Sequence, residues 1–574
     1  MLRNIMISFA LISTMIIWIY TTNSPSESIV RNSVQALDSS SPNIEAGALR
    51  VRLHPWPQSF NPLTSQHRDL GLLSSLVHGQ LLYHSQLDWT LQPGIAEKWE
   101  AKDDGKTYRF ELDKRANFPD GSRVTPEDIK FTLTLLSDVK ACRKCEILRA
   151  ELGPIENVTT LPDENAVEVR MRNVHFSHLE KLGTLPIYQK KKFSSGDFNQ
   201  DYEKTLWGAG PYEYDEKNSE PGSAIVLRRK IDHWIKKTAY FTGRHNFETV
   251  ILKNIPNDAV AFRMFKKKAL DLFYFDQASH QLWDRESNPS RRDPNITLVE
   301  SDFERPRFWS GIALNMRRPL LNQLLFRRAL QLSLNRDLII RQTLGNHFKP
   351  VHGPFLSASK DDLSPKSMTF NLDEASKLLR QLGFTKKDSS GVLFREIDHA
   401  ETKVKQYARV RILYASKGHD AWLETYKKDA GKLGIDIQNE LVDWETARKR
   451  VGEFNFDAFI VGWGSSPTPE PSVLWHSSTA KHRNTSNLSG FSDPEVDRLI
   501  DLTRILSDKE ERMRRFAEIE KRIVDAQPYV FRWSKKSHLV AYWKDRIRPM
   551  DKPLHQYSGN IQHEPFFLHW HPAF

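Results

Sequence analysis

Cysteine is scarce in this chain of 574 residues, which contains only Cys142 and Cys145, in the segment ACRKCE. A lone pair of cysteines in an oxidising compartment most often forms a disulfide. A thioredoxin-like redox site would require a strand before the motif, where the pattern instead predicts a capped helix. Two free thiols, or a zinc site completed by His175 and His178, are further interpretations, although the spacing departs from that of zinc fingers.

The apolar run near the N-terminus is shorter than a typical membrane span. It extends over sixteen residues from Ile5 to Tyr20, follows Arg3 and precedes the polar segment TTNSPSES. As a helix it would measure roughly 24 Å, against about 30 Å for the hydrocarbon core of a membrane. We therefore predict an export signal over residues 1–24, with an uncleaved anchor as the alternative, and a linker over residues 25–47.

Recognisable catalytic motifs are absent. The chain contains no HExxH and no Walker loop. GAGPY at residues 208–212 lacks the third glycine of a dinucleotide loop, and SASK at 357–360 has no SDN or KTG partner. GWGSS at 462–466 is not a nucleophile elbow, which needs G-x-S-x-G. These absences favour a binding protein over an enzyme, and we expect no cofactor.

Metal binding has one further candidate besides the zinc site above. Three histidines lie among aromatic residues at the C-terminus: His563, His569 and His571. Packing of these rings on the core is the more ordinary interpretation, so we expect no metal.

Positive charge is in moderate excess but is not concentrated. The chain has 83 Lys and Arg residues against 72 Asp and Glu residues, a net charge of +11. The lysine runs at 190–192 and 266–268 lie far apart, and no nucleic-acid-binding motif accompanies them. We therefore interpret them as solvated faces and expect no nucleic-acid partner.

Strand and helix patterns alternate along the chain, which predicts a mixed α/β protein. In residues 117–135, a Pro-Asp-Gly turn precedes Thr125, which is placed to cap a helix with Pro126 at its first position. FDAFIV at 456–461 is typical of a strand buried on both faces. Gly434 is expected to end a helix just before a strand.

Several segments together resemble the family 5 extracellular solute-binding proteins, the peptide and nickel receptors of ABC importers. They follow the family's order over residues 49–545 and include LQPGIAEKWEAKDDGKTYRFELDKRANFPDGSRVTPEDIKFTL, GAGPYEY, GIALNMRRPLLNQLLFRRALQLSLNRDLI, NLDEASKLLRQLG, LGIDIQNELVDW and NLSGFSDPEVDRLID. GRHNFETVILKNIPNDAVAFRMFKKKALDLF and NMRRP are most similar to the branch that binds murein peptides and microcin C.

The resemblance implies a two-lobed periplasmic-binding-protein fold of type II, in its large peptide-binding class, with mixed sheets flanked by helices. Lobe I would comprise residues 48–302, with the extra subdomain, and the return segment 527–574; lobe II would comprise 303–526. It further implies a periplasmic monomer that takes a peptide or peptide-like ligand and contacts ABC permease subunits, with tethering to the inner membrane by an uncleaved N-terminal segment as the alternative. Contact with the membrane would occur only through the export segment or the permease.

Oligopeptide receptors of this family hold the ligand backbone between strands of the two lobes. Carried over to this chain, the resemblance implies ligand contacts by Gln66, His67, Arg68, Arg317, Trp444, Gly462, Trp463, Gly464, Ser465, Ser466 and Glu470. Trp444 falls where the family places a pocket tryptophan, and a core tryptophan on an amphipathic helix is the alternative.

This chain departs from the oligopeptide receptors at both ends of the ligand. Ser466 stands where those receptors carry an aspartate for the ligand ammonium, and Glu470 is the nearest carboxylate. Val451 and Ile460 occupy positions that can bear arginines for the ligand carboxylate. A standard free-ended peptide is therefore in doubt, and Arg317 and Arg68 could favour an anionic ligand.

We predict a substrate-binding protein of an ABC importer, without catalysis. An exported hydrolase of peptides or cell-wall fragments is one alternative, which turnover of a ligand would identify. A peptide receptor or chaperone without a transport role is the other, and a permease gene in the same operon would argue against it.

Overall fold

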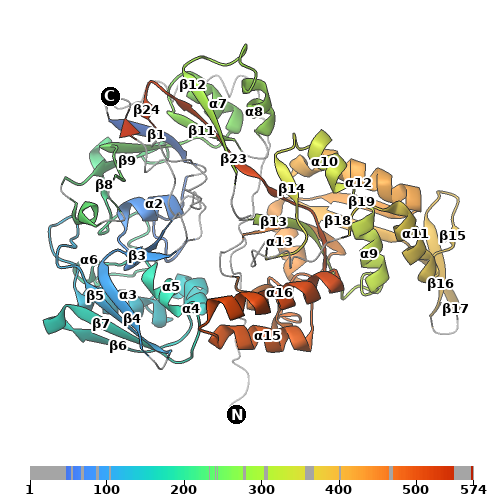
Figure 1. Cartoon of the computed structure of the whole chain (residues 1–574), viewed down its shortest axis with the longest axis horizontal. Coiled ribbons are helices and arrows are strands. Elements are labelled where there is room, and N and C mark those ends of the chain that lie inside the picture. Colours follow the sequence, from blue (N-terminus) through green and yellow to red (C-terminus); the bar gives the residue numbers. More distant parts are fainter. Residues whose placement is uncertain are drawn as a thin grey trace. The chain divides into compact units, whose positions relative to one another are not determined.

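The computed structural model describes residues 47–53, 56–65, 70–85, 90–102, 105–231, 233–238, 241, 243–275, 279–302, 308–355, 368–399, 402–464, 469–548 and 571–572. They divide into two compact units (Figure 1). The N-terminal unit contains the described residues from 47 to 302 and those from 538 onward, and the central unit contains those from 308 to 537.

The division differs in one place from the expected lobes. The return segment is expected to begin at residue 527, whereas the central unit extends to Ser537. The reason is strand pairing: β21 (Tyr529–Phe531) pairs with β13 (Phe308–Leu314), and β22 (Trp533–Lys535) pairs with β14 (Phe348–Pro350).

The described strands of the N-terminal unit form four sheets and a hairpin. Their strands, in sheet order, are β1 (Ala48–Leu53), β10 (Thr249–Asn254), β9 (Ala224–Arg229) and β8 (Tyr212–Tyr214); β4 (Ala96–Ala101), β5 (Thr107–Leu112), β7 (Ala166–Met171) and β6 (Ile155–Leu161); β11 (Leu272–Phe275), β23 (Ser537–Trp543) and β12 (Ile296–Asp302); β24 (Ile547–Arg548) and β25 (His571–Pro572); and the hairpin β2 (Leu82–His84) and β3 (Leu91–Pro93). β1 and β10 run parallel, and β23 brings the return segment back beside β11.

Short helices accompany these sheets. They are α2 (Leu70–Val77), α3 (Pro126–Ser137), α4 (Glu146–Leu152), α5 (His178–Gly183), α6 (Lys190–Phe193), α7 (Asp258–Lys266) and α8 (His280–Glu286).

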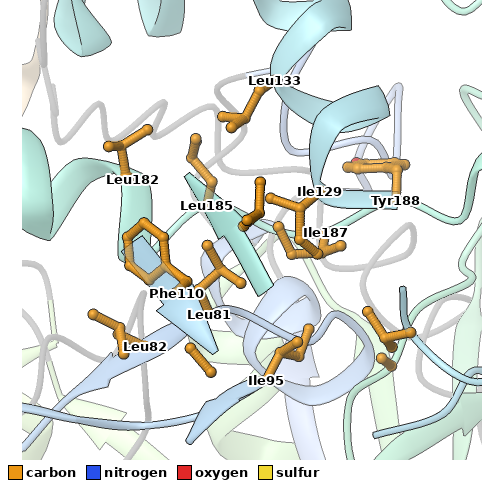
Figure 2. Close-up of a cluster of buried hydrophobic side chains, with 14 of the residues drawn as sticks. Leu81, Leu82, Ile95, Phe110, Ile129, Leu133, Leu182, Leu185, Ile187 and Tyr188 are labelled. Carbon is orange, nitrogen blue, oxygen red and sulfur yellow. The ribbon is translucent and has the colours of Figure 1, made fainter. Parts of the chain in front are cut away.

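The helix α3 confirms the expected cap and apolar stripe. Thr125 is the N-cap, and Asp128 accepts hydrogen bonds from the Thr125 amide at 2.9 Å and hydroxyl at 2.7 Å. Ile129 and Leu133 are buried in a core shared with the strand β5 and the segment 182–188, part of which Figure 2 shows. The Pro-Asp-Gly turn and the helix α3 that follows it therefore belong to the framework of this unit.

Cys142 and Cys145 lie in a short helical turn after α3. The structure joins them in a disulfide, with 5.3 Å between their Cα atoms, and both side chains are fully buried. A capped helix, and not a strand, precedes the pair, as expected.

A five-stranded sheet is the centre of the central unit. Its strands, in sheet order, are β19 (Asp436–Leu441), β18 (Arg409–Tyr414), β20 (Ala458–Gly464), β13 and β21. β18, β19 and β20 run parallel to one another, and β13 runs antiparallel to β20. A smaller sheet contains β15 (Lys386–Lys387), β16 (Leu393–His399) and β17 (Thr402–Tyr407).

Eight α-helices lie in the described part of this unit. They are α9 (Leu324–Leu332), α10 (Arg336–Gln342), α11 (Leu372–Gln381), α12 (Asp420–Leu433), α13 (Trp444–Gly452), α14 (Ser472–Trp475), α15 (Pro494–Ile505) and α16 (Lys509–Ala526), of which α15 and α16 pack side by side (Figure 1). The expected buried strand is β20, and Gly434 ends α12 with φ +87°. No helix of the described residues combines the length and apolarity needed to cross a membrane.

Candidate ligand-binding site

The expected ligand-binding residues divide into two groups. Gln66, His67, Arg68, Ser465 and Ser466 lie outside the described residues, as do residues 357–360, His563 and His569. The other group lies in the central unit and consists of Arg317, Trp444, Gly462, Trp463, Gly464 and Glu470. The site is therefore described from the central unit alone.

Trp444 and Gly464 lie at the same edge of the five-stranded sheet. The parallel strands β18, β19 and β20 end at Tyr414, Leu441 and Gly464. Because parallel strands direct their carboxyl ends to the same edge, the turns after them lie together there, where open α/β sheets bind their ligands. Trp444 begins α13 just after β19, so it shares this edge with Gly464.

The three residues of the Gly-Trp-Gly segment have different surroundings. A Cβ atom on Gly462 would approach the Phe308 ring to 2.3 Å, so the absence of a side chain lets this ring cover the strand. Trp463 points to the other face and is buried, beside Tyr529. Gly464 is exposed. Of the three, Gly464 is therefore the one whose backbone lies open at the edge.

Trp444 is half-buried at the first position of α13. Asp443 caps this helix, since its Oδ1 accepts a hydrogen bond from the Thr446 amide at 2.9 Å. The cap holds the start of the helix, where Trp444 lies. Part of the indole remains accessible to solvent, which suits a ring that packs on a ligand.

Glu470 forms a local contact at the start of α14. Its Oε1 accepts hydrogen bonds from the amide of Ser472, at 3.3 Å, and from the Ser472 hydroxyl. A carboxylate in this position also stabilises the N-terminal end of the helix. Oε1 of Glu470 therefore stabilises the start of α14.

Arg317 directs its guanidinium toward main-chain carbonyls. Nη1 donates to the carbonyl of Leu488 at 2.9 Å, and Nη2 donates to those of Asn487, at 3.2 Å, and Ala480. The guanidinium also lies 3.8 Å from the centre of the Phe454 ring. Desolvation lowers the pKa of Arg317 to about 10, which leaves it charged. These contacts favour a structural role over a ligand contact.

An Arg317→Lys variant is therefore expected to lose about 2 kcal/mol of its free energy of unfolding, because lysine cannot satisfy several carbonyls and stack at once. Urea denaturation would measure the loss. Arg318→Lys is the matched control, since Arg318 is more exposed and its Nε contacts the Phe456 carbonyl at 3.1 Å. A loss of ligand affinity above tenfold in a variant of unchanged stability would instead identify Arg317 as a ligand contact.

Sequence reasoning missed a cationic and aromatic cluster at the same edge. β21 ends at Phe531, and the amide of the next residue, Arg532, donates to the Ser310 carbonyl of β13 at 2.9 Å. The Arg532 guanidinium lies 4.2 Å from the centre of the Trp422 ring and 4.5 Å from that of the Trp533 ring. Trp422 lies more than a hundred positions before Arg532 and Trp533, so no local sequence pattern predicts the cluster.

Metal ligands do not gather in the described part of the chain, where no group of three His, Cys, Asp or Glu side chains is placed to hold an ion.

Comparison with known proteins assigns the family. The model of the bacterial extracellular solute-binding proteins, family 5 middle, matches residues 90–485, more than half of the chain. The chain belongs to this family. Its members are solute-binding proteins, found in the periplasm or outside the cell, and not enzymes.

Individual family members resemble the chain over most of its length. The probable peptide-binding protein YejA of Agrobacterium fabrum is 24% identical over 561 residues, covering 89% of this chain and 88% of the relative. The oligopeptide-binding protein AppA of Bacillus subtilis is 22% identical over 497 residues, covering 84% and 85%.

The solved structures identify the fold. NikZ from Campylobacter jejuni, in complex with Ni(L-His), superimposes with a TM-score of 0.73 at 18% identity, covering 92% of this chain and 100% of the neighbour. The family 5 chain therefore has the two-lobed periplasmic-binding-protein fold, with mixed sheets flanked by helices.

Proposed function

We propose that this protein captures peptides or peptide-containing compounds outside the inner membrane and delivers them to the permease of an ABC importer. The observation that carries the proposal is the family match over residues 90–485. The names of two relatives that span most of the chain, a probable peptide-binding protein and an oligopeptide-binding protein, support the peptide as ligand class.

The edge of the central sheet suits a peptide. Gly464 is exposed at the end of β20, and hydrogen bonds between a strand end and a peptide backbone give affinity without reading side chains. The half-buried ring of Trp444 supplies apolar surface that accepts many residue types. Binding would then shift the population of conformations toward the one that the permease recognises.

We further propose export through residues 1–24, a monomeric state and contact with permease subunits. The N-terminal segment lies outside the described residues. Its apolar run after a basic residue supports the export signal.

We expect stoichiometric peptide binding without turnover. A defined peptide pool is incubated with the purified protein for hours, unbound peptides are removed by gel filtration, and the retained peptides are released and identified by mass spectrometry. The proposal predicts retained peptides of unchanged mass. Shortened peptides that depend on the protein would favour the exported hydrolase, and no retained peptide would contradict peptide capture.

A further inference from the structure

Buried arginines in the described part of the central unit donate hydrogen bonds to main-chain carbonyls, with one exception. Arg327 donates from Nη1 to the Leu321 carbonyl at 2.9 Å and from Nη2 to the Ala526 carbonyl at 2.6 Å. Arg336 donates from Nη1 to the Val351 carbonyl at 2.5 Å. In both cases carbonyl oxygens compensate the removal of the guanidinium from water, as buried charges require.

Arg532 is the exception. Its side chain is only 2% exposed, and within the described residues its guanidinium has no hydrogen bond and no ion pair. The guanidinium lies in the corner between Trp422 and Trp533, whose rings meet edge to face with 5.3 Å between their centres and 87° between their planes. Nε is fully enclosed without an acceptor, whereas the two terminal nitrogens are not among the fully enclosed atoms.

The N-terminal end of α12 lies beside Arg532. Trp422 belongs to the first turn of α12, so the guanidinium lies near the N-terminal end of this helix, where main-chain amides give a partial positive charge. His419, which precedes the helix, has its pKa lowered to about 3 by burial and by the charge of Arg532. Asp420 accepts a hydrogen bond from the Tyr414 hydroxyl at 2.8 Å.

Stacking alone does not account for this arrangement. Contacts with two indole rings recover part of the lost hydration of a guanidinium, but they leave its five N–H donors unsatisfied. A buried charge without an acceptor is strongly unfavourable, and a methionine of similar length would pack against the same rings without that cost. The same geometry suits a bound anion, because the terminal nitrogens of Arg532, which are not fully enclosed, can form paired hydrogen bonds with it.

We propose that Arg532 and the N-terminal turn of α12 form an anion subsite that receives a carboxylate of the bound peptide. The inference rests on the proposed function and specifies its ligand chemistry. The carboxylate is either the C-terminal one or that of an acidic side chain.

The test compares Arg532→Met with Arg327→Met, a control at a buried arginine whose donors are satisfied. Without ligand, Arg532→Met is expected to unfold at a urea concentration no lower than that of the wild type, whereas Arg327→Met unfolds earlier because it leaves carbonyls unpaired. Destabilisation of Arg532→Met to the same extent as Arg327→Met would assign Arg532 a structural role and overturn the inference.

The binding arm uses a tryptic digest of casein and the same digest with every carboxyl group methyl-esterified. The wild type is expected to retain peptides from the first pool and not from the second. For one retained peptide, calorimetry should show an affinity about tenfold to a hundredfold lower in Arg532→Met, the effect of losing hydrogen bonds to a charged group. Arg532→Lys, which keeps the charge, should recover part of it.

Further comparisons separate the possible results. Amidation of the C-terminus, or replacement of acidic residues by their amides, shows which carboxylate is bound. Equal retention of both pools, or unchanged affinity in Arg532→Met, overturns the inference while peptide capture stands. Retention of neither pool contradicts the proposed function and the inference together.

Discussion

A Gly210→Ala variant is expected to lose about 3 kcal/mol of its free energy of unfolding, at the upper end of the cost of overpacking. A Cβ atom at this position would lie 2.5 Å from the main-chain carbon of Val77, 2.7 Å from its oxygen and 2.8 Å from the Leu76 oxygen. Main-chain atoms cannot rotate away as a side chain can. The loop would have to move, and its hydrogen bond from the Gly210 amide to the Val77 carbonyl, 2.9 Å long, would weaken.

Urea unfolding followed by circular dichroism would measure this change. Gly431→Ala is the control, because it makes the same substitution inside α12, where no atom lies within 4 Å of the new Cβ. Alanine is the better helix former there, so this variant should gain up to about 1 kcal/mol. Equal stability of Gly210→Ala and the wild type would show that the loop does not depend on this close approach.

The glycines of GAGPY thus have a structural explanation. Gly208 and Gly210 both lie against the backbone of the segment that ends α2, where a Cβ would meet the Val77 oxygen at 2.5 Å and 2.7 Å. The missing third glycine argues against a dinucleotide loop, but the structural reason for the remaining two could not be inferred from sequence. It depends on a contact between segments more than a hundred residues apart.

Local patterns predicted local structure well. The cap at Thr125, the stripe of Ile129 and Leu133, and the helix end at Gly434 each depend on neighbours within a few residues. Such features follow from turn chemistry and helical periodicity. The end of the central unit at Ser537 could not be predicted from local patterns, because it depends on which strands β21 and β22 pair with.

The chemistry of individual arginines was the least predictable part of the site. Arg317 in NMRRP could be a ligand contact by position, yet its donors face the carbonyls of residues 480–488. Arg532 has no distinguishing sequence context, and its exceptional feature is the lack of an acceptor within the described residues. Both properties depend on which main-chain oxygens the fold brings near, and composition carries no information on that.

An Asp271→Ala variant is expected to lose about 3 to 5 kcal/mol, the cost of removing one partner from a buried charge cluster. The Asp271 side chain is 1% exposed. Its Oδ2 accepts a hydrogen bond from the Arg50 amide at 2.6 Å, and its Oδ1 accepts one from Nη1 of Arg546 at 2.8 Å. The carboxylate therefore connects β1, the start of β11 and the return segment of the N-terminal unit.

The two partners of Asp271 explain why the loss should be large and should fall on the return segment. In the alanine variant, the Arg50 amide and the Arg546 guanidinium both lose a charged acceptor, and among the described residues Arg546 keeps its contact with the Lys268 carbonyl at 2.8 Å. Asp271→Asn, which retains one acceptor oxygen, should lose less. Glu111→Ala is the control, because its carboxylate is 36% accessible and pairs with Lys98, which is 73% accessible, and at 3.6 Å with Arg109. Such exposed pairs contribute about 1 kcal/mol or less. Urea unfolding gives the three free energies, and hydrogen exchange at residues 539–543 reports whether β23 has loosened. If Asp271→Ala and Glu111→Ala were equally stable, the return segment would be held by the strand pairing and apolar contacts of β23, and the carboxylate would have no part in attaching it.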